Sequence, residues 1–385
     1  MRDPQFGLVN SAPHSTLFVS VCCAALIVFL SSCSADLPVQ REGQHIKEGS
    51  PSVSYSIVFI IHGDGDYFYH DTSGKEYKAD EEALEEATLV ALQNPYAEVF
   101  IFHQRPKKHF LFFFPLHDGE FSYYRNGRLI ANESYWRDNE QSRFEPEVEL
   151  YRRFRMEHQH EAVRLFLYSG HEIPEFGGAG YDESYPDRAF TVHDLEAGLD
   201  GFTHDSTKFD LMVLSTCFGG TPYTIGALGS FARYIIASPD NLHLSYFDLH
   251  GLDRLDRSLR VETVPALAKR FAQQAFDRLA KNIQTSVSVA MYDVDSVEQF
   301  ISSVRSMYDR TLTALKGETQ ASALMAEHCD CADLPAYMLP TMKAGVDVLY
   351  RPARFGRSRG KMKHSGWECW KVPESQPETS HNSEP

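Results

Sequence analysis

Two stretches of the chain decide its fold, VRLFLYSGH at residues 163–171 and FDLMVLSTCFGG at residues 209–220. Each is a short apolar run bounded by polar and glycine-containing segments, which is typical of a buried β-strand. Between them, TVHDLEAGL at residues 191–199 has a polar start and apolar residues at helical spacing. This segment predicts a crossover helix, so we expect the two strands to be parallel. Parallel strands end at the same edge of a sheet, where open α/β sheets hold their sites.

His171 and Cys217 follow these two strands and are the candidate catalytic residues. Neighbouring strands lie about 4.8 Å apart, so the imidazole and the thiol can meet just beyond the strand ends. An imidazole accepts the proton of a thiol or lowers its pKa, which creates a nucleophilic thiolate. Backbone N–H groups can hold the oxyanion that forms when an amide is attacked. The pattern predicts a Cys/His pair for acyl transfer, although Cys217 alone also fits a small buried apolar residue.

The rest of the chain predicts further elements of an α/β protein. Asp118-Gly119 and Asn126-Gly127 are turn signals within a hairpin region at residues 109–130, and we expect its phenylalanines, 110 and 112–114, to lie in the core. The other expected elements are strands at 56–61, 98–102 and 232–237, and helices at 79–92, 147–162, 264–283 and 297–315.

In its strand-then-His and strand-then-Cys motifs the chain resembles the caspase-like cysteine peptidases of clan CD, and among them the clostripain family. The motifs that carry the resemblance are SIVFIIHGDGD at residues 56–66, residues 190–217, and ARYIIASPD at residues 232–240. The resemblance implies a caspase-like, mostly parallel sheet flanked by helices, with a helical C-terminal region. It also implies His171 as general base, Cys217 as nucleophile, and oxyanion N–H groups from Cys217 and Glu172. The implied activity is that of an endopeptidase that cuts after arginine or lysine.

The sequence departs from the family pattern at two places. Relatives have Gly directly after the catalytic His, whereas here Gly170 precedes it and Glu172 follows. Relatives also carry an Asp that helps to form the pocket for basic residues, and Ser215 stands at that position. The remaining acidic candidates for such a pocket are Asp240, Asp182 and Asp64.

The resemblance also bears on maturation and cofactors. Family members often cut themselves in the loop after the catalytic His, and Arg188 is the candidate self-cleavage site there. Some relatives need calcium; apart from that analogy we expect no cofactor. His328, Cys329, Cys331, His364 and Cys369 do not have the spacing of a zinc signature, so no metal site is predicted. A disulfide from Cys369 to Cys329 or Cys331 stays open.

Two other classes of function stay open. One is a catalytically inactive binding lipoprotein that keeps the fold. The other is an α/β-hydrolase-type esterase that uses Cys217, because Ile60-Ile61-His62-Gly63 resembles the oxyanion loop of that fold, with His243 or His250 as base. No G-x-S-x-G motif is present, and a strand order that places His62 beside Cys217 would favour this reading.

The N-terminus predicts export and a lipid anchor. Residues 17–30 form a mostly apolar run that is typical of the core of a signal peptide and short for a membrane span. Leu30-Ser31-Ser32-Cys33 resembles the bacterial lipobox, which implies cleavage before Cys33 and lipidation of that residue. The expected location is the bacterial cell envelope, lipid-anchored, periplasmic or surface-exposed.

Composition and segment order complete the expected organisation. The net charge of −16 leaves no basic stripe for nucleic acid, so the expected partners are protein or peptide substrates and the membrane. A hydrophobic fraction of 43% fits one large folded domain. We expect a signal peptide at 1–32, a lipidated tether at 33–52, a caspase-like catalytic domain at 53–260, a helical region packed on it at 261–373, and a disordered tail at 374–385.

Overall fold

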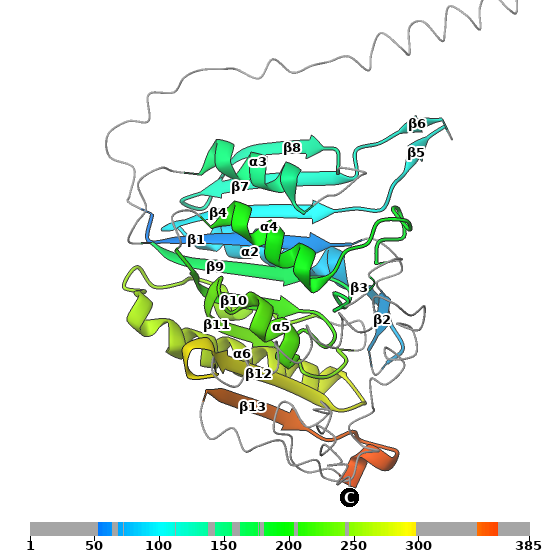
Figure 1. Cartoon of the computed structure of the whole chain (residues 1–385), viewed down its shortest axis with the longest axis vertical. Coiled ribbons are helices and arrows are strands. Elements are labelled where there is room, and N and C mark those ends of the chain that lie inside the picture. The colour runs from blue at the N-terminus through cyan, green and yellow to red at the C-terminus, as the bar shows by residue number, and fades with distance from the viewer. Residues whose placement is uncertain are drawn as a thin grey trace, which may run out of the picture. The chain divides into compact units, whose positions relative to one another are not determined.

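The computed structural model describes the central and later parts of the chain, and a nine-stranded mixed sheet organises them (Figure 1). The described residues are 53–63, 68–71, 73–111, 113–137, 143–155, 162–175, 177, 181–203, 207–242, 246–297 and 345–360. Several predictions therefore lie outside the described residues: those for the signal peptide, the tether and the tail, and those for Cys33, Asp64, Cys329, Cys331 and Cys369. The same holds for nearly all of the helix expected at 297–315.

The strand order of the large sheet is β13-β12-β11-β10-β9-β1-β4-β7-β8. Five neighbouring strands, from β11 to β4, are parallel, and antiparallel pairs extend the sheet at both ends. The strands are β1 Tyr55–His62, β4 Ala97–Gln104, β7 Gly119–Arg125, β8 Arg128–Tyr135, β9 Val163–Ser169, β10 Phe209–Ser215, β11 Ala232–Ala237, β12 Val287–Asp293 and β13 Val346–Arg351; two small hairpins pair β2 Phe68–His70 with β3 Glu76–Lys78, and β5 His109–Phe110 with β6 Phe114–Pro115. The predicted α/β class with a mostly parallel sheet is confirmed.

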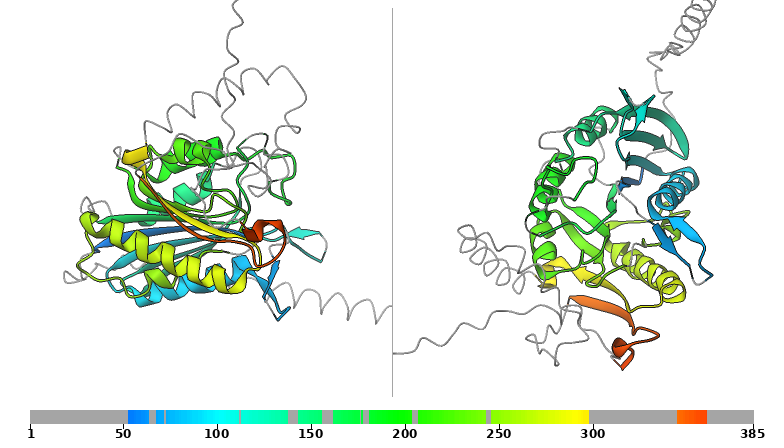
Figure 2. Two further views of the ribbon diagram at one scale, coloured as in Figure 1. Left: turned by 90° about the horizontal axis from the view of Figure 1, so that it is seen from below. Right: turned by 90° about the vertical axis from the view of Figure 1, so that its right-hand side faces the viewer.

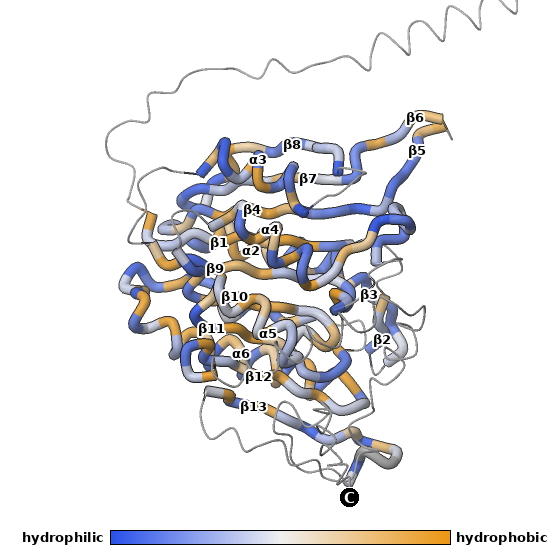
Figure 3. The backbone as a smooth tube through the Cα atoms, in the orientation of Figure 1, coloured by the Kyte–Doolittle hydropathy of each residue, from blue (hydrophilic) through white to orange (hydrophobic). Residues whose placement is uncertain are grey.

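Helices cover both faces of this sheet (Figure 2). One face packs α2 Ala79–Gln93 and α6 Val264–Asn282 against odd-numbered residues of β1, such as Ile57 and Phe59. The other face packs α3 Glu145–Phe154, α4 Val192–Phe202 and α5 Pro222–Leu228 against the alternate residues, such as Val58 and Ile60. Because successive side chains of a strand point to opposite faces, strands buried on both sides are mainly apolar, and β1 is buried along its whole length. The hydropathy colouring shows the hydrophobic stretches of these strands (Figure 3).

The crossover helix between the two deciding strands begins as its sequence indicates. Thr191 precedes α4 and forms a capping box with Asp194, in which the Asp194 carboxylate accepts hydrogen bonds from the backbone N–H and the hydroxyl of Thr191. These contacts satisfy donors that the first turn of a helix leaves unpaired. Leu195 and Leu199 are then buried on the sheet. The local pattern and the tertiary packing agree here.

The C-terminal part differs from the helical region that the sequence predicts. The long helix α6 is present, but β12 and β13 follow it and extend the same sheet beyond β11. The sequence of β12, VSVAMYD, carries a signal for this, because β-branched residues alternate with small ones. Three short 3-10 helices complete the described elements, η1 His250–Leu252, η2 Val261–Thr263 and η3 Arg357–Gly360.

The hairpin region between β4 and β8 also differs from expectation. Asn126-Gly127 forms the predicted turn with positive φ angles of 53° and 73°, as a two-residue hairpin turn requires. Asp118-Gly119 does not turn the chain, since Gly119 begins β7 and Asp118 is buried. The phenylalanines expected in the core are exposed, namely Phe110, Phe113 and Phe114; Phe112 lies outside the described residues.

Candidate active site

The ends of β9 and β10 place the two candidate catalytic residues at the same edge of the sheet. The strands pair in parallel with Ser215 opposite Ser169, so Cys217 and His171 each lie two residues beyond the last pair. The Gly170 N–H donates to the Ser215 carbonyl oxygen at 3.4 Å, which continues the pairing toward the two residues. The equal offset means that both side chains start at the same level of the sheet edge. Neither is shut away from solvent, because both residues are partly buried.

The thiol of Cys217 has polar neighbours from the segment that follows β11. The thiol donates to the side-chain oxygen of Asn241 at 3.2 Å, and the backbone N–H of Leu242 donates to the sulfur at 3.3 Å. An N–H aimed at the sulfur stabilises negative charge there, because hydrogen bonding to a charged form favours that form. The segment after β11 thus helps to define the environment of the nucleophile.

A strained turn follows Cys217. Phe218 has a φ of 51°, in the left-handed region that bulky residues rarely adopt, and its N–H donates to the Asp240 carbonyl at 3.1 Å. A Cβ on Gly220 would lie 2.6 Å from the Tyr292 hydroxyl and 3.0 Å from backbone atoms, so only glycine fits there. The Tyr292 hydroxyl donates to the Gly220 carbonyl at 2.9 Å. The surrounding structure therefore holds the turn in a conformation that the local sequence would not choose.

His62, at the end of β1, lies on the other side of the His171 strand. A Cβ on Gly170 would come within 2.9 Å of the His62 Cβ and of the Tyr168 hydroxyl, which explains why glycine precedes His171. β9 separates β1 from β10, so His62 and Cys217 are at the ends of strands that are not neighbours. The α/β-hydrolase alternative requires a strand order that places His62 beside Cys217, and this sheet does not have that order.

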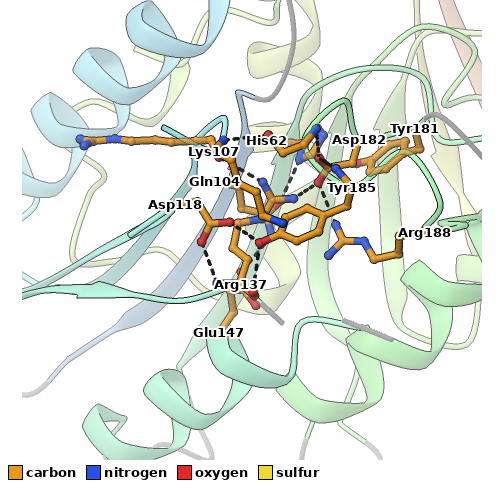
Figure 4. A network of polar contacts seen from close by, with 12 residues as sticks. His62, Gln104, Lys107, Asp118, Arg137, Glu147, Tyr181, Asp182, Tyr185 and Arg188 are labelled. Atoms are coloured by element: carbon orange, nitrogen blue, oxygen red, sulfur yellow. Dashed lines mark hydrogen bonds and ion pairs between the residues drawn. The ribbon is translucent and has the colours of Figure 1, made fainter. Parts of the chain in front are cut away.

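The His62 ring is neutral and has a defined tautomer. The Gln104 amide nitrogen donates to Glu147 at 2.9 Å, so its oxygen faces His62 and accepts from Nδ1–H at 2.9 Å (Figure 4). Nε2 is buried and has no hydrogen-bond partner among the described residues. Burial, followed by the nearby Arg137 guanidinium, lowers the pKa of His62 well below its usual value. The ring also stacks on Tyr181 with centroids 4.7 Å apart.

Asp182 and Arg188 belong to a buried cluster in the loop that follows His171. The fully buried Asp182 carboxylate is paired with Arg137 and, at 2.8 Å, with Arg188, whose side chain is only 7% exposed (Figure 4). Its other oxygen accepts from the backbone N–H groups of Ser184 at 3.0 Å and Tyr185 at 3.2 Å. In this conformation Asp182 is occupied by cations of its own chain, and Arg188 is held away from solvent.

A second part of the cluster joins the loop to the β4–β8 region. The Tyr185 hydroxyl donates to Asp118, which also accepts the backbone N–H of Arg137 at 2.9 Å. The Arg188 guanidinium lies over the Tyr185 ring, 4.8 Å from its centroid. The buried Asp118 at the start of β7 therefore anchors the loop after His171, which explains why it does not act as a turn residue.

Two carboxylates on the His171 segment carry raised pKa values. Burial raises the pKa of Glu172 to about 7. Burial, partly offset by a hydrogen bond from Thr221, raises the pKa of Glu175 to about 8. Thr221 is the N-cap of α5 and follows the Cys217 turn, so its contact with Glu175 connects the segments after the two strands. Sequence motifs point to Glu172 only through its backbone N–H and do not point to Glu175, because neither spacing nor residue type marks a loop glutamate for burial.

Ser215 and Asp240, at the positions considered for a basic-residue pocket, use their polar groups within the chain. The Ser215 hydroxyl is buried and accepts from the Phe247 N–H at 2.7 Å. A small cavity beside it is lined mainly by apolar residues, including Phe59, Leu167 and Tyr246. Asp240 is partly buried, and its backbone N–H and carbonyl both contact the Ser238 hydroxyl.

In the part of the chain that the structure describes, one group of side chains has the composition of a metal site, Glu86, Asp248 and His250. These side chains are hydrogen-bonded to other groups of the same chain. The Glu86 oxygens accept from the Tyr246 hydroxyl and the Leu249 N–H, each at 2.8 Å, and the His250 ring contacts Asp248 at 2.8 Å. The calcium requirement of some relatives stays a family analogy for this chain, and no cofactor is otherwise expected.

An α/β protein with a Cys/His pair at the edge of a mostly parallel sheet is thus the class that the fold and site define. The sequence profile of the clostripain family, Peptidase C11, matches residues 168–334, which include β10 and the position of Cys217. This part of the chain is similar to the clostripain family. No curated protein matches the sequence.

Solved structures of C11 cysteine proteases are similar to the chain. A secreted C11 cysteine protease from Bacteroides thetaiotaomicron, in complex with an irreversible peptide inhibitor, has a TM-score of 0.45 and 14% identity, covering 64% of this chain and 67% of that one. An inactive zymogen C11 protease from Parabacteroides distasonis has a TM-score of 0.44 and 12% identity, covering 75% and 73%. None of the helices in the described ranges combines the length and hydrophobicity needed to span a membrane.

Proposed function

We propose that the chain is a cysteine endopeptidase in which Cys217 is the nucleophile and His171 the general base. The observation that carries this proposal is the register of β9 and β10, which sets both residues two positions beyond the pair Ser169 and Ser215. The match to a family of cysteine peptidases over this region supports it, and protein or peptide substrates follow from that family.

The proposed reaction proceeds in two acyl-transfer steps. His171 takes the proton of the Cys217 thiol, and the thiolate attacks the carbonyl carbon of the scissile amide. The oxyanion is held by the backbone N–H groups of Cys217 and Glu172, the protonated His171 gives its proton to the leaving amine, and a thioester remains. Water, deprotonated by His171, then attacks the thioester; the acid product leaves and the Cys217 thiol is restored.

Cleavage after arginine or lysine is the finer part of the proposal. A guanidinium in a desolvated pocket needs a carboxylate, since an unpaired buried charge costs several kcal/mol. Asp240 is the candidate beside the Cys217 turn, since its backbone carbonyl accepts the Phe218 N–H at 3.1 Å. Glu175 is a second candidate, because a cation beside it would offset the burial that raises its pKa. Asp64 lies outside the described residues.

The experiment compares Cys217→Ala, His171→Ala and a matched control, His193→Ala, whose side chain is 71% exposed on α4. Fluorogenic peptides with Arg, Lys, Ala or Asp before the scissile bond measure turnover and specificity. We expect no turnover for Cys217→Ala, a loss of about 10²-fold or more for His171→Ala, and unchanged turnover for His193→Ala. Wild-type turnover in Cys217→Ala would contradict the assignment.

A second measurement separates an inactive fold from an enzyme whose substrate is missing from the panel. An electrophilic thiol probe should label wild type at Cys217 and much more slowly in His171→Ala, because only the thiolate reacts readily. Equal labelling rates in the two proteins would favour the inactive binding protein.

We further propose that the mature chain is anchored to the bacterial envelope through lipid on Cys33. Several acyl chains give stable anchoring at about 0.8 kcal/mol per buried CH₂. Cys33→Ser should release the protein from membranes or leave an unprocessed precursor. A mature-length, membrane-bound Cys33→Ser protein would contradict lipidation.

A further inference from the structure

The β5–β6 hairpin extends away from the sheet and carries an apolar tip (Figures 1 and 3). Phe110, Leu111, Phe113 and Phe114 are 59%, 63%, 81% and 62% exposed. Contiguous apolar surface of this kind is uncommon on soluble proteins, and it marks interaction sites when polar residues surround it. The tip therefore needs an explanation beyond folding.

The hairpin is an ordered element of the chain. Phe110 pairs with Phe114 across the two strands, and the Leu116 N–H donates to the Lys108 carbonyl at 2.9 Å. Leu111 closes the turn with a φ of 48°. The pairing holds the phenylalanines on a short, protruding ribbon instead of folding them back onto the core.

The charge of this region is opposite to that of the whole chain. Residues 105–117 contain Arg105, Lys107 and Lys108 and no Asp or Glu, whereas the chain has a net charge of −16. Arg105 is paired with Glu120 of β7, so the excess positive charge of the hairpin comes from the two lysines. Lys107 and Lys108 are exposed at the base of the hairpin, directly before the apolar tip. The local charge thus complements an anionic surface.

Aromatic side chains also lie at the base of the hairpin. Trp136, at the end of β8, is 47% exposed, and its ring lies against His117 with centroids 4.4 Å apart. An exposed Trp, exposed lysines and a protruding phenylalanine tip match the requirements of a membrane interface, where aromatic rings sit at headgroup level and lysines reach the phosphates.

The hairpin lies at the same edge of the sheet as the candidate active site. It connects β4 to β7, and β4 runs parallel to β1, so its end at Gln104 is at the edge where β9 and β10 end. The Lys107 N–H donates to the Ser184 hydroxyl at 2.7 Å, which ties the base of the hairpin to the loop that follows His171.

We propose that this hairpin binds the surface of an anionic lipid bilayer, with Phe110, Phe113 and Phe114 in the interface and Lys108 among the headgroups. Docking in this way turns the Cys217 edge of the sheet toward the membrane. The hairpin makes this contact through its own residues, so the proposal depends neither on peptidase activity nor on lipidation of Cys33.

The first test places a fluorescent reporter at the tip of the full-length chain. Phe113→Trp is compared with Ile130→Trp, a control on β8 where the side chain is 56% exposed. Both are titrated with vesicles of phosphatidylglycerol and brominated phosphatidylcholine, and the wild-type signal is subtracted. We expect quenching and a blue shift at position 113 only. This local readout reports the hairpin even if the N-terminus also binds the vesicles.

The second test measures how the reporter signal depends on charge. In the Phe113→Trp chain, Lys108→Glu should weaken vesicle binding by about fivefold or more. Vesicles of phosphatidylcholine alone should quench the reporter much less at equal lipid concentration, and added salt should reduce the binding to anionic vesicles.

The third test removes the tip from the wild-type chain. The triple variant Phe110→Ser/Phe113→Ser/Phe114→Ser should keep the wild-type circular dichroism and should lose about tenfold or more of the part of vesicle binding that salt abolishes. Leu129→Ser/Ile130→Ser, on the exposed part of β8, is the matched control and should bind as wild type does.

Three outcomes would overturn the proposal. The first is no quenching at position 113, or equal quenching at positions 113 and 130. The second is equal affinity for neutral and anionic vesicles. The third is self-association in the absence of lipid that the triple serine variant abolishes, because it would assign the hairpin to a second copy of the chain.

Discussion

Asp182 should be the most sensitive charged residue of the loop that follows His171. Its carboxylate accepts four hydrogen bonds, from Arg137, Arg188 and the N–H groups of Ser184 and Tyr185. Asp182→Ala leaves two buried guanidinium groups without their carboxylate. Breaking a buried pair from one side costs about 3–5 kcal/mol, because the remaining charge stays desolvated.

The structure also orders the variants around this residue. Arg188→Ala keeps the pair between Asp182 and Arg137, so it should cost less, about 1.5–3 kcal/mol for a lost hydrogen bond between charged groups. Asp187→Ala is the control from the same loop, since Asp187 is exposed, and it should stay within about 0.5 kcal/mol of wild type.

Urea unfolding followed by circular dichroism gives the free energies of unfolding. We expect the midpoint to fall by about 1 M or more in Asp182→Ala. Trypsin should also cut after Arg188 faster in this variant than in wild type, because the 7% exposed side chain is released. If the enzyme accepts arginine, self-cleavage after Arg188 should rise as well, and it should vanish when Cys217→Ala is added.

A midpoint for Asp182→Ala that equals the midpoint for Asp187→Ala would refute this reasoning. A larger destabilisation by Arg188→Ala than by Asp182→Ala would refute it too, because Asp182 is the single carboxylate shared by two guanidinium groups.

Three further predictions concern the residues around the candidate site. Between pH 4.5, the ordinary pKa of glutamate, and about 8, its raised value here, Glu175 binds more protons in the folded chain than in the unfolded one. Ionisation of Glu175 therefore destabilises the fold as the pH rises through this window. The urea midpoints measured at pH 5 and at pH 8.5 should differ less in Glu175→Gln than in wild type. An unchanged difference would contradict the raised pKa. Gly170→Ala should lower the free energy of unfolding by about 1–3 kcal/mol and reduce turnover, because the new methyl group would lie 2.9 Å from His62 and Tyr168. The control Gly360→Ala, with open space around it, should be neutral in the same unfolding and turnover assays. Ser215→Ala should lower the free energy of unfolding by about 1–3 kcal/mol, because the Phe247 N–H loses its acceptor. Ser215→Asp should lower it further, because the carboxylate charge would face an apolar cavity. A stable Ser215→Asp variant with new arginine specificity would show instead that the cavity opens to substrate.

The strands that carry His171 and Cys217 could be predicted because their signals are local. A run of buried apolar residues, a glycine-containing end and an amphipathic helix between two such runs leave few arrangements other than parallel strands. The same two segments of sequence also place His171 and Cys217 at an equal distance beyond the ends of their strands. The pairing of Ser169 with Ser215 agrees with that prediction.

The exposure of Phe110, Phe113 and Phe114 could not be predicted in this way. Hydrophobicity predicts burial on average, but a side chain is buried only when another element covers it. The segment between β4 and β7 forms its own two-stranded hairpin, and no described element packs over its tip. Composition alone cannot distinguish a core strand from such a ribbon.

What the sequence determined by itself is the class of fold and the two strand ends, and it marked His171 and Cys217 as candidates, because periodicity and strand direction are properties of short segments. Only the tertiary structure decided the rest: β9 between β1 and β10, Asp182 shared by Arg137 and Arg188, and Glu175 beside Thr221. These contacts join residues that are 6 to 46 positions apart in the chain. Their energies depend on burial and on the exact distance between charged groups, and neither quantity exists until the sheet and its loops have packed together.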